Sequence, residues 1–408
     1  MSDLLLRHAR VLDVVAGAYR DDHDVLVRDG RIAAVGPGLP AGDVPALDLT
    51  GRTLLPGLID CHVHLLAVTA DLATLHTSSP MYVAAQAAGL MREMLARGFT
   101  TVRDNAGADY GLAQAQAEGL MAGPRVFFCG RALSQTGGHG DSRRRGQHVI
   151  DEHPGCPVMT RVADGVDGVR RAAREELRNG AYHIKIMVSG GVASPTDEVD
   201  TTQYSLDEIR AVVEEAEAAG KYVSAHAYPD AAISRALRCG VRSIEHGNLL
   251  DQESLDLLVE HGAYLTPTLV TYWALKEEGP AWGLPPASHA KVDSVLGAGL
   301  EALRRAHDAG VNLCFGTDLL GGMQRHQLQE FTIRAQVQPA IEVIRAATVN
   351  AAELIRRPGE LGVIAEGAHA DLVVVDGDPL ADISVLVPDD GRQPMVIQAG
   401  QVVSQTAR

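Results

Sequence analysis

The sequence predicts an α/β protein, a (β/α)8 TIM barrel with a small β-sandwich domain formed from both chain termini. Two patterns support this prediction. In the first, a helical stretch ends at a glycine and a short β-prone run follows at once, repeatedly along the middle of the chain. In the second, both ends of the chain hold β-prone runs and turns without helical periodicity. A chain of 408 residues has room for one barrel and one small domain.

The glycine pattern marks the places where helices end and strands begin. Glycine supplies the left-handed residue that follows a helix, so each copy predicts one helix end. Two further strand-like runs, 53–64 and 124–130, raise the number of candidate strands to eight. Strands that alternate with helices form parallel βαβ units, and eight units favour a barrel over a doubly wound sheet. The glycines are Gly98, Gly180, Gly220, Gly240, Gly262 and Gly310.

Amphipathic helices are predicted between the strands. Ser205 and Glu208 have the spacing of a capping box, and apolar residues follow them at positions i, i+3, i+4 and i+7. A second apolar stripe runs from Val83 to Leu95. We therefore expect helices to cover the strands of the barrel.

The two ends of the chain differ from its middle. Asp29-Gly30 and Ala399-Gly400 are turn signals between β-prone runs. We predict that residues 1–54 and 361–408 form one composite β-sandwich domain, and that residues 55–360 form the barrel.

Composition and charge exclude several classes of protein. Apolar residues make up 46% and charged residues 22%, which is ordinary for a globular protein. A net charge of −16 argues against nucleic acid or an anionic membrane as a partner. Five scattered cysteines without a Cys-x-x-Cys pair argue against a disulfide framework. Charged residues within the first ten positions argue against a signal peptide. The longest uncharged run, 72–91, is too polar to span a membrane. We therefore expect a cytoplasmic protein.

His62 and His64 close the first predicted strand. Successive side chains of a strand alternate between its faces, so these two imidazoles point the same way. Such a pair suits one divalent metal ion, commonly zinc. The alternative is a pair of buried, hydrogen-bonded histidines.

Polar side chains also close three later strands. His226, His246 and Asp318 follow the fifth, sixth and eighth strands. An isolated histidine on an apolar strand is usually a core residue with its hydrogen bonds satisfied. Barrel enzymes keep their chemistry at the carboxyl ends of their strands, so the recurrence favours a metal site.

Lys185 lies inside a predicted buried strand, 184–188. Lysine is almost never fully buried without a partner, and burial lowers its pKa toward a neutral, nucleophilic amine. Such an amine can add carbon dioxide to form a carbamate, an anionic ligand that can bridge two metal ions. The alternative is a snorkelling lysine or a plain ion pair.

These residues resemble those of the amidohydrolase superfamily, in its binuclear type with a carboxylated lysine, and the match covers nearly the whole chain. Three details are most similar to the prolidase-like group of Xaa-Pro dipeptidases, which includes amidohydrolases acting on N-acyl amino acids and ochratoxin. The details are Gly-Gly-His-Gly-Asp at 137–141, Ser-Gly-Gly at 189–191 and His-Ala-Tyr at 226–228.

The resemblance implies two divalent metal ions, for which zinc is expected, although cobalt and manganese can also be accommodated. It also implies a hydroxide that bridges the two ions, and N6-carboxylysine at position 185. The implied ligands are His62, His64 and Asp318 for one metal, His226 and His246 for the other, and carboxylated Lys185 between them.

The implied reaction is hydrolysis of the amide bond of a dipeptide or an N-acyl amino acid, and ochratoxin-type aryl amides fall within it. The bridging hydroxide attacks the carbonyl carbon, and Asp318 passes a proton to the departing amine. Tyr228 donates to the oxyanion, and His139 contacts the substrate. For Tyr228 the alternative is a packed aromatic side chain, and for the loop of His139 a flexible turn.

The segment 131–165 lacks clear periodicity and follows the third strand, so we expect it to be an active-site loop. Arg143 in this segment suits the free carboxylate of the substrate, although a solvated basic loop explains it equally well. His326 is expected to line the pocket. Trp273 and Trp282 would form an apolar wall or pack a lid.

Three alternatives stay open at this point. One is a hydrolase of a cyclic amide, a lactone or a phosphotriester on the same scaffold. A second is a deaminase with one metal, against which Lys185 speaks. A third, a scaffold without activity, is disfavoured because no ligand position is missing. The expected partner is a small-molecule amide or dipeptide, and the resemblance implies a homo-oligomer of up to eight subunits.

Overall fold

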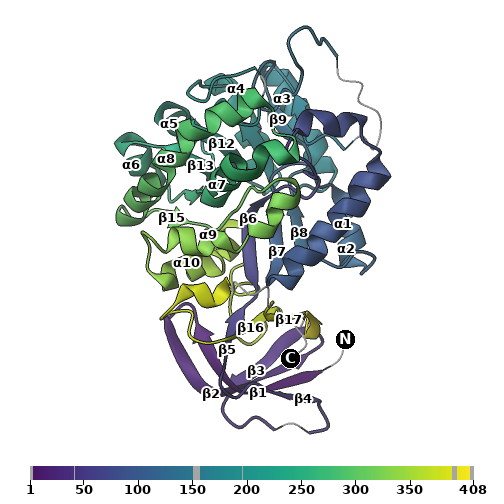
Figure 1. Ribbon diagram of the computed structural model, residues 1–408, viewed down its shortest axis with the longest axis vertical. Helices are drawn as coiled ribbons and strands as arrows, with labels where there is room; N and C mark the ends of the chain where they lie inside the picture. The colour runs from purple at the N-terminus through teal and green to yellow at the C-terminus, as the bar shows by residue number, and fades with distance from the viewer. Residues whose placement is uncertain (1–2, 41, 150–156, 195, 388–392, 405–408) are drawn as a thin grey trace.

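The computed structural model describes residues 3–40, 42–149, 157–194, 196–387 and 393–404. Figure 1 shows a helix-rich upper body and a β-rich lower body, where both chain ends lie. The mixed α/β content agrees with the predicted class.

Strands from both ends of the chain form one mixed sheet in the lower body. Their order is β18-β17-β16-β5-β1-β2-β3, with β4 beside β1. Strands from the two chain ends are therefore hydrogen-bonded neighbours in one sheet, and the β-sandwich domain stays a prediction. The strands are β1 (Leu4–Asp13), β2 (Ala18–Arg28), β3 (Arg31–Gly36), β4 (Ala46–Asp48), β5 (Arg52–Pro56), β16 (Leu372–Asp376), β17 (Met395–Gln398) and β18 (Gln401–Ser404).

Two tight turns join strands of this sheet. Asp29 and Gly30, with φ of 50° and 76°, link β2 to β3. Ala399 and Gly400, with φ of 47° and 77°, link β17 to β18. Paired left-handed residues match the twist of a hairpin, so the predicted turn signals are confirmed.

Two parallel sheets form the upper body. One has the order β6-β7-β8, and the other has the order β10-β9-β11-β12-β13-β14-β15. Their strands are β6 (Leu58–Val63), β7 (Phe99–Asp104), β8 (Arg125–Phe128), β9 (Ala132–Ser134), β10 (Thr160–Val162), β11 (Ile184–Met187), β12 (Val223–Pro229), β13 (Ser243–Leu249), β14 (Tyr264–Thr266) and β15 (Asn312–Leu313).

Backbone hydrogen bonds connect the two parallel sheets on both sides. The amide of Tyr182, just before β11, donates over 2.8 Å to the carbonyl of Phe128, the last residue of β8. The amide of Cys61 in β6 donates to the carbonyl of Phe315 over 2.8 Å, just after β15. The carboxyl ends of these strands therefore lie at a common edge.

The predicted strand 53–64 is in fact two strands. Its first part, β5, belongs to the sheet of the chain ends, and its second part, β6, belongs to a parallel sheet. The chain changes sheets at Gly57, where an added Cβ would lie 2.1 Å from Oγ1 of Thr100. Only glycine allows such a close approach of backbone and neighbour.

Helices surround the parallel strands (Figure 1). In α4 the predicted capping box between Ser205 and Glu208 is present, and in α1 the predicted stripe is buried from Val83 to Leu95. The helices are α1 (Pro80–Ala96), α2 (Tyr110–Ala117), α3 (Gly165–Arg178), α4 (Leu206–Ala218), α5 (Asp230–Arg238), α6 (Gln252–Glu260), α7 (Leu269–Glu278), α8 (Pro286–Asp308), α9 (Gln329–Arg334), α10 (Ala340–Ala346) and α11 (Val349–Leu354). The 3-10 helices are η1 (Leu72–Thr77), η2 (Gly279–Trp282), η3 (Gly321–His326) and η4 (Ile383–Leu386).

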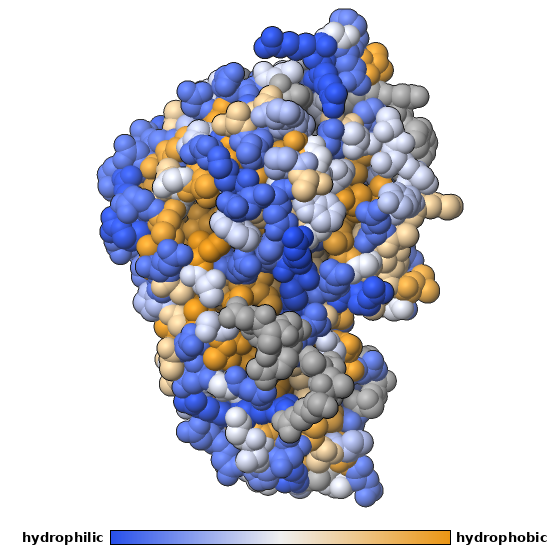
Figure 2. All heavy atoms as spheres, viewed as in Figure 1, coloured by the Kyte–Doolittle hydropathy of each residue, from blue (hydrophilic) through white to orange (hydrophobic). Residues whose placement is uncertain are grey.

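The surface in Figure 2 is mostly hydrophilic, with apolar side chains in smaller patches between polar ones. No helix in the described part of the chain is both long and apolar enough to cross a membrane. Four described cysteines, Cys61, Cys129, Cys239 and Cys314, are free thiols, and Cys156 lies outside the described residues. The cytoplasmic location and the homo-oligomer stay predictions.

Candidate metal centre and active site

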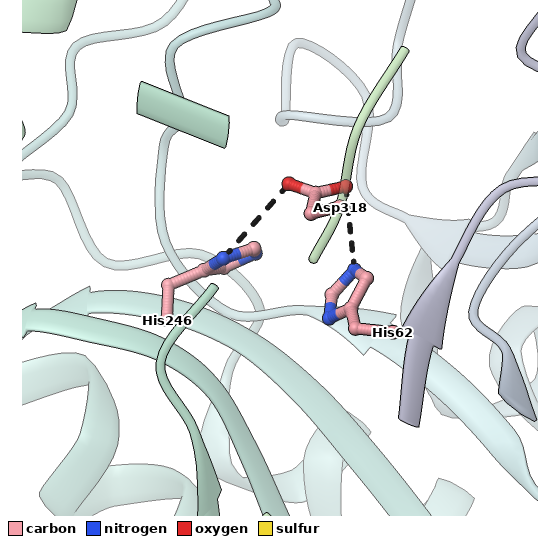
Figure 3. Close-up of side chains that lie close together, drawn as sticks. All are labelled: His62, His246 and Asp318. Atoms are coloured by element: carbon pink, nitrogen blue, oxygen red, sulfur yellow. Dashed lines mark ion pairs between the residues drawn. The ribbon is translucent and has the colours of Figure 1, made fainter. Parts of the chain in front are cut away.

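A cavity of about 650 Å³ opens at the carboxyl ends of the parallel strands. All six predicted metal ligands border it, although they come from distant parts of the chain. Among them, ligand atoms of His62, His246 and Asp318 lie within 4.8 Å of one another. Figure 3 shows both imidazoles directed at the carboxylate. The predicted ligands that border the cavity are His62, His64, Lys185, His226, His246 and Asp318.

Asp318 lies among three of the imidazoles. Its Oδ1 is 3.0 Å from Nε2 of His64 and 3.5 Å from Nε2 of His62. Its Oδ2 is 4.0 Å from Nδ1 of His246. The ring of His226 completes the group, with its centroid 4.7 Å from that of His246.

Each of these four imidazoles has one ring nitrogen bound by the protein. Carbonyl and carboxylate oxygens only accept, so the nitrogen that faces them must carry the proton. The hydroxyl of Thr268 donates its own proton to Tyr272. Its oxygen therefore accepts from Nδ1 of His246, which carries the proton of that ring. In the rings of His62, His226 and His246 the other nitrogen keeps its lone pair, as a metal ligand requires, whereas Nε2 of His64 is hydrogen-bonded to Asp318. The contacts are His62 Nδ1 to Glu245 (2.8 Å), His64 Nδ1 to Ala106 O (3.2 Å), His226 Nε2 to Gly190 O (3.0 Å) and His246 Nδ1 to Thr268 Oγ1 (2.8 Å).

Burial keeps most of these rings neutral. It lowers the pKa of His62, His226 and His246 well below the usual value of 6.5, and the ammonium of Lys185 lowers it further. Burial also lowers the pKa of His64, but its hydrogen bond to Asp318 outweighs that effect and raises the pKa overall. The charge distribution therefore favours neutral rings for His62, His226 and His246, while the carboxylate of Asp318 favours the protonated form of His64.

Lys185 is buried, with 1% of its surface exposed, and its side chain borders the same cavity. Burial lowers the pKa of its amine to about 8. Within the described part of the chain, no hydrogen bond or ion pair reaches its Nζ. The predicted burial of the amine is confirmed. The alternative, a plain ion pair, would need an acidic partner within 4.0 Å of Nζ, and none is found among the described residues.

Glu245 and Arg103 are site residues that the sequence analysis missed. Glu245 is fully buried and accepts from Nη2 of Arg103 over 2.7 and 2.8 Å and from Ser243 over 2.6 Å. Burial alone would raise the pKa of Glu245, but the charges of Arg103 and Lys185 lower it overall, so this carboxylate is ionised behind His62. The available signal was a charged residue inside each of two β-prone runs, Arg103 in 99–104 and Glu245 in 243–249.

The backbone is strained at three neighbouring strand ends. His246, Thr268 and Asp318 have positive φ of 76°, 46° and 52°, which non-glycine residues rarely adopt. Each such conformation costs about 1–3 kcal/mol and persists only where the surroundings enforce it. His246 and Asp318 border the cavity, and Thr268 bonds to the ring of His246 from behind.

Tyr228 and His139 both border the cavity, as predicted. The hydroxyl of Tyr272 donates to Oη of Tyr228 over 3.2 Å, and the backbone amide of Val192 also bonds to that oxygen. Because Oη of Tyr228 accepts from both groups, its own proton is left to donate. The ring of His139 stacks on that of His226, with centroids 4.1 Å apart.

Two predicted substrate contacts do not border the cavity. Arg143 is held by Asp141 through Nε at 2.7 Å and Nη2 at 2.6 Å, because this carboxylate two residues away matches the guanidinium fork. Arg144 borders the cavity instead. His326 bonds to Glu278 over 2.7 Å.

Trp273 and Trp282 are also outside the cavity lining. Trp273 packs edge-on against His326, and the ring of Trp282 lies over Gly322, where an added Cβ would be 2.1 Å from it. Their positions agree with the alternative that both tryptophans pack against neighbouring segments and do not form the wall of the cavity. The apolar wall consists of aliphatic side chains and prolines, among them Leu72, Met159, Leu275, Pro280, Leu284, Pro285 and Pro286.

The segment 131–165 contributes to the cavity, as expected of an active-site loop, although it also contains the short strands β9 and β10. Residues 150–156 of this segment lie outside the described residues. The lining residues from the segment are His139, Gly140, Ser142, Arg144, Val158, Met159 and Thr160.

Comparisons with known proteins show which family and which solved structures this chain resembles. Residues 53–403 match the amidohydrolase family. An ochratoxinase from Aspergillus niger is 36% identical over 386 residues, which cover 88% of this chain and 78% of that protein. A prolidase solved in complex with N-methylphosphonate-L-proline is 50% identical, with a TM-score of 0.96 over 99% of this chain and 100% of that one. A Xaa-Pro dipeptidase with methionine bound in its active site is 29% identical, with a TM-score of 0.86 over 98% of this chain and 99% of that one.

The resemblance drawn from the sequence is thus confirmed, and the relatives share the fold of this chain over nearly its full length. The family generally binds divalent metals, for which His62, His246 and Asp318 form a candidate site here. The protein is a hydrolase that acts on amide bonds, and the chain belongs to the amidohydrolase family.

Proposed function

We propose that this protein is a binuclear zinc amidohydrolase that cleaves the amide bond of dipeptides or N-acyl amino acids and releases the C-terminal amino acid. Ochratoxin-type aryl amides fall within this class. The observation that carries the proposal is the group of four imidazoles around Asp318 and Lys185, each ring held by its other nitrogen. The similarity to a prolidase and an ochratoxinase supports the substrate class.

The donor set fits two divalent cations. Imidazole nitrogens and carboxylate oxygens suit zinc, and the ring orientations leave lone pairs toward the cavity. When bound, two such cations lower the pKa of a water molecule and polarise the amide carbonyl. The proposed ligands are His62, His64 and Asp318 for one ion, His226 and His246 for the other, and carboxylated Lys185 between them.

Lys185 is proposed to be N6-carboxylysine. Its neutral amine forms a bond to the carbon of carbon dioxide, and one amine proton leaves to solvent, which gives an anionic carbamate. The lowered pKa of about 8 supports this step, because the neutral form is then accessible near neutral pH. The product also replaces a buried cation with an anion beside four imidazoles, and cations bound there would compensate its charge.

Two side chains are proposed to act on the substrate. Asp318 takes up a proton on its carboxylate and transfers it to the departing amine, since general acid–base groups must lie beside the reacting bond. Tyr228 donates its free proton to the developing oxyanion. Both side chains border the cavity near His246.

Substrate binding is proposed to involve His139 and Tyr228. Arg144, which borders the cavity, is better placed than Arg143 to meet the carboxylate of the substrate. The bond between His326 and Glu278 favours a role for His326 in supporting the neighbouring wall. The apolar lining suits a substrate with a bulky apolar acyl group or side chain.

We also propose that the two parallel sheets close into one (β/α)8 barrel over residues 55–360, and that residues 1–54 and 361–408 form a β-sandwich domain. The hydrogen bonds on both sides of the three-stranded sheet support closure. The joint sheet of the two chain ends supports the composite domain.

The experiment that tests the function is a kinetic screen of the zinc-loaded protein on N-acyl amino acids and dipeptides with varied C-terminal residues. Lactones, cyclic amides and a phosphotriester serve as the contrasting set. We expect turnover of the linear amides that bear a free carboxylate. Turnover confined to the contrasting set would overturn the proposal and favour the alternative of a cyclic amide, lactone or phosphotriester hydrolase.

A further inference from the structure

We propose that Ser194 and Asp197 fix the tautomer and orientation of His139, and that Lys291 holds the loop that carries them. All three would be positioning residues for amide hydrolysis. This inference rests on the proposed function only in assuming that His139 faces the substrate.

The hydrogen bonds around Ser194 determine where the proton of His139 lies. Nδ1 of His139 is 2.9 Å from Oγ of Ser194. The only proton of this hydroxyl is directed at Oδ1 of Asp197 and at the carbonyl of Gly191, 3.0 Å away, and both groups only accept. Ser194 must therefore accept from His139, so that Nδ1 carries the proton.

Gln203 connects the backbone of His139 to the carboxylate of Asp197. Its Nε2 donates to Oδ2 of Asp197 over 2.9 Å, and its Oε1 accepts from the backbone amide of His139 over 2.9 Å. Gln203, Ser194 and Asp197 are all buried, so these bonds are shielded from water. The network thus fixes both the main chain and the ring of His139.

Lys291, in α8, holds this loop from the other side. Its ammonium donates to the carbonyls of Gly191, Ser194 and Asp197 over 3.1, 3.0 and 2.5 Å. Three protons thus meet three carbonyl groups, and the side chain is only 16% exposed. The ammonium of Lys291 therefore stabilises the positions of these three carbonyl groups.

The ring of His139 is also confined on its faces. His226 stacks on it with an interplanar angle of 19°. An added Cβ at Gly191 would lie 2.1 Å from Cε1 of His139, so only glycine allows this approach. With Nδ1 used by Ser194, the neutral ring presents Nε2 to a ligand as an acceptor.

The first test is spectroscopic and needs no substrate. In the zinc-loaded protein labelled with 15N-histidine, long-range 1H–15N correlations report which ring nitrogen of each histidine is protonated, and the His139→Asn variant assigns the signals. We expect Nδ1–H for His139 in the native protein. In Ser194→Ala this preference should be lost, while Ser194→Thr, which keeps the hydroxyl, should restore it. Protonation of Nε2 alone in the native protein, or an unchanged tautomer in Ser194→Ala, would overturn the inference.

The second test is kinetic and uses N-acetyl-L-phenylalanine and the best substrate of the screen. We expect Ser194→Ala and Lys291→Met to lower kcat about 10- to 100-fold, with a smaller change in KM and with unchanged zinc content. Ser194→Thr should recover most of kcat. The controls are Ser254→Ala, which removes a buried hydroxyl from α6, and Lys276→Met, which removes an ion pair with Asp293. Equal losses in the controls would overturn the positioning role.

The two tests separate this inference from the proposed function. If the native protein shows Nδ1–H but hydrolyses none of the linear amides, the proposed function fails and the tautomer assignment stands. If the amides are hydrolysed and Ser194→Ala turns over normally, the positioning role fails and the proposed function stands.

Discussion

The carboxylate of Glu245 lies 2.8 Å from Nδ1 of His62, so an ionised group stands directly behind one of the proposed metal ligands. Arg103 holds the other side of this carboxylate, with both residues fully buried. A carboxylate in this position orients the imidazole and raises its basicity toward a metal.

We therefore expect Glu245→Gln to weaken zinc binding about 10- to 100-fold. It should also lower the free energy of unfolding by about 3 kcal/mol, because Arg103 loses its buried counter-charge. Chelator competition and urea unfolding measure the two effects. Ser243→Ala is the matched control, since Ser243 bonds to the same carboxylate without bordering the cavity, and it should lose less zinc affinity. Unchanged affinity in Glu245→Gln would contradict the role of this carboxylate.

Asp318→Asn tests the proposed proton transfer. The amide keeps the size of the side chain and an oxygen ligand but cannot take up the proton, so kcat should fall about 10²- to 10⁴-fold. Zinc content should be largely retained. Steady-state kinetics with elemental analysis check both statements, and near-native rates would remove the assigned role.

Carboxylation of Lys185 should depend on carbon dioxide and on pH. Metal-free protein prepared without carbon dioxide should regain activity faster when zinc is added with carbon dioxide than without it. The amine reacts in its neutral form, which predominates above its pKa of about 8 and is a minor fraction below it. At constant dissolved carbon dioxide the rate should therefore rise roughly tenfold between pH 7 and pH 9, as the neutral fraction of the amine grows. A 13C carbamate signal that is absent from Lys185→Met would identify the site, and reactivation indifferent to carbon dioxide would argue against it.

Metal removal should change both activity and stability. Ligands that bind only the folded state stabilise it, by about 4 kcal/mol when present at a thousand times Kd, so a chelator should lower Tm and abolish turnover. Elemental analysis of the native protein should give about two zinc equivalents per chain. One equivalent would favour the single-metal deaminase type, and none would favour a scaffold without activity.

The two neighbouring arginines should behave differently. Arg144→Ala should raise KM about tenfold for N-acyl amino acids, because a charged hydrogen bond to the substrate carboxylate is lost. The corresponding amino acid amides, which lack that carboxylate, should show little change. Arg143→Ala serves as the comparison, since Asp141 already binds this guanidinium. Equal effects of the two substitutions would refute the assignment to Arg144.

Local patterns in the sequence determined the residues that meet at the site. Alternation along a strand placed His62 and His64 on one face, and the rule for strand ends selected His226, His246 and Asp318. A lysine inside an apolar run identified Lys185 as buried. These rules work because they depend only on backbone geometry and on the cost of burying charge, both of which act over a few residues.

Only the tertiary structure decided how those side chains are oriented and held. The partner of each imidazole comes from another strand or loop, as Glu245 does for His62, and no local pattern specifies it. Arg143 bonds to Asp141, whereas Arg144 reaches the cavity, although the two are adjacent in sequence. Ser194 meets His139 across 55 positions of the chain. Such contacts depend on how whole helices, strands and loops pack together. Residues far apart in sequence become hydrogen-bond partners only when that packing brings them close in space.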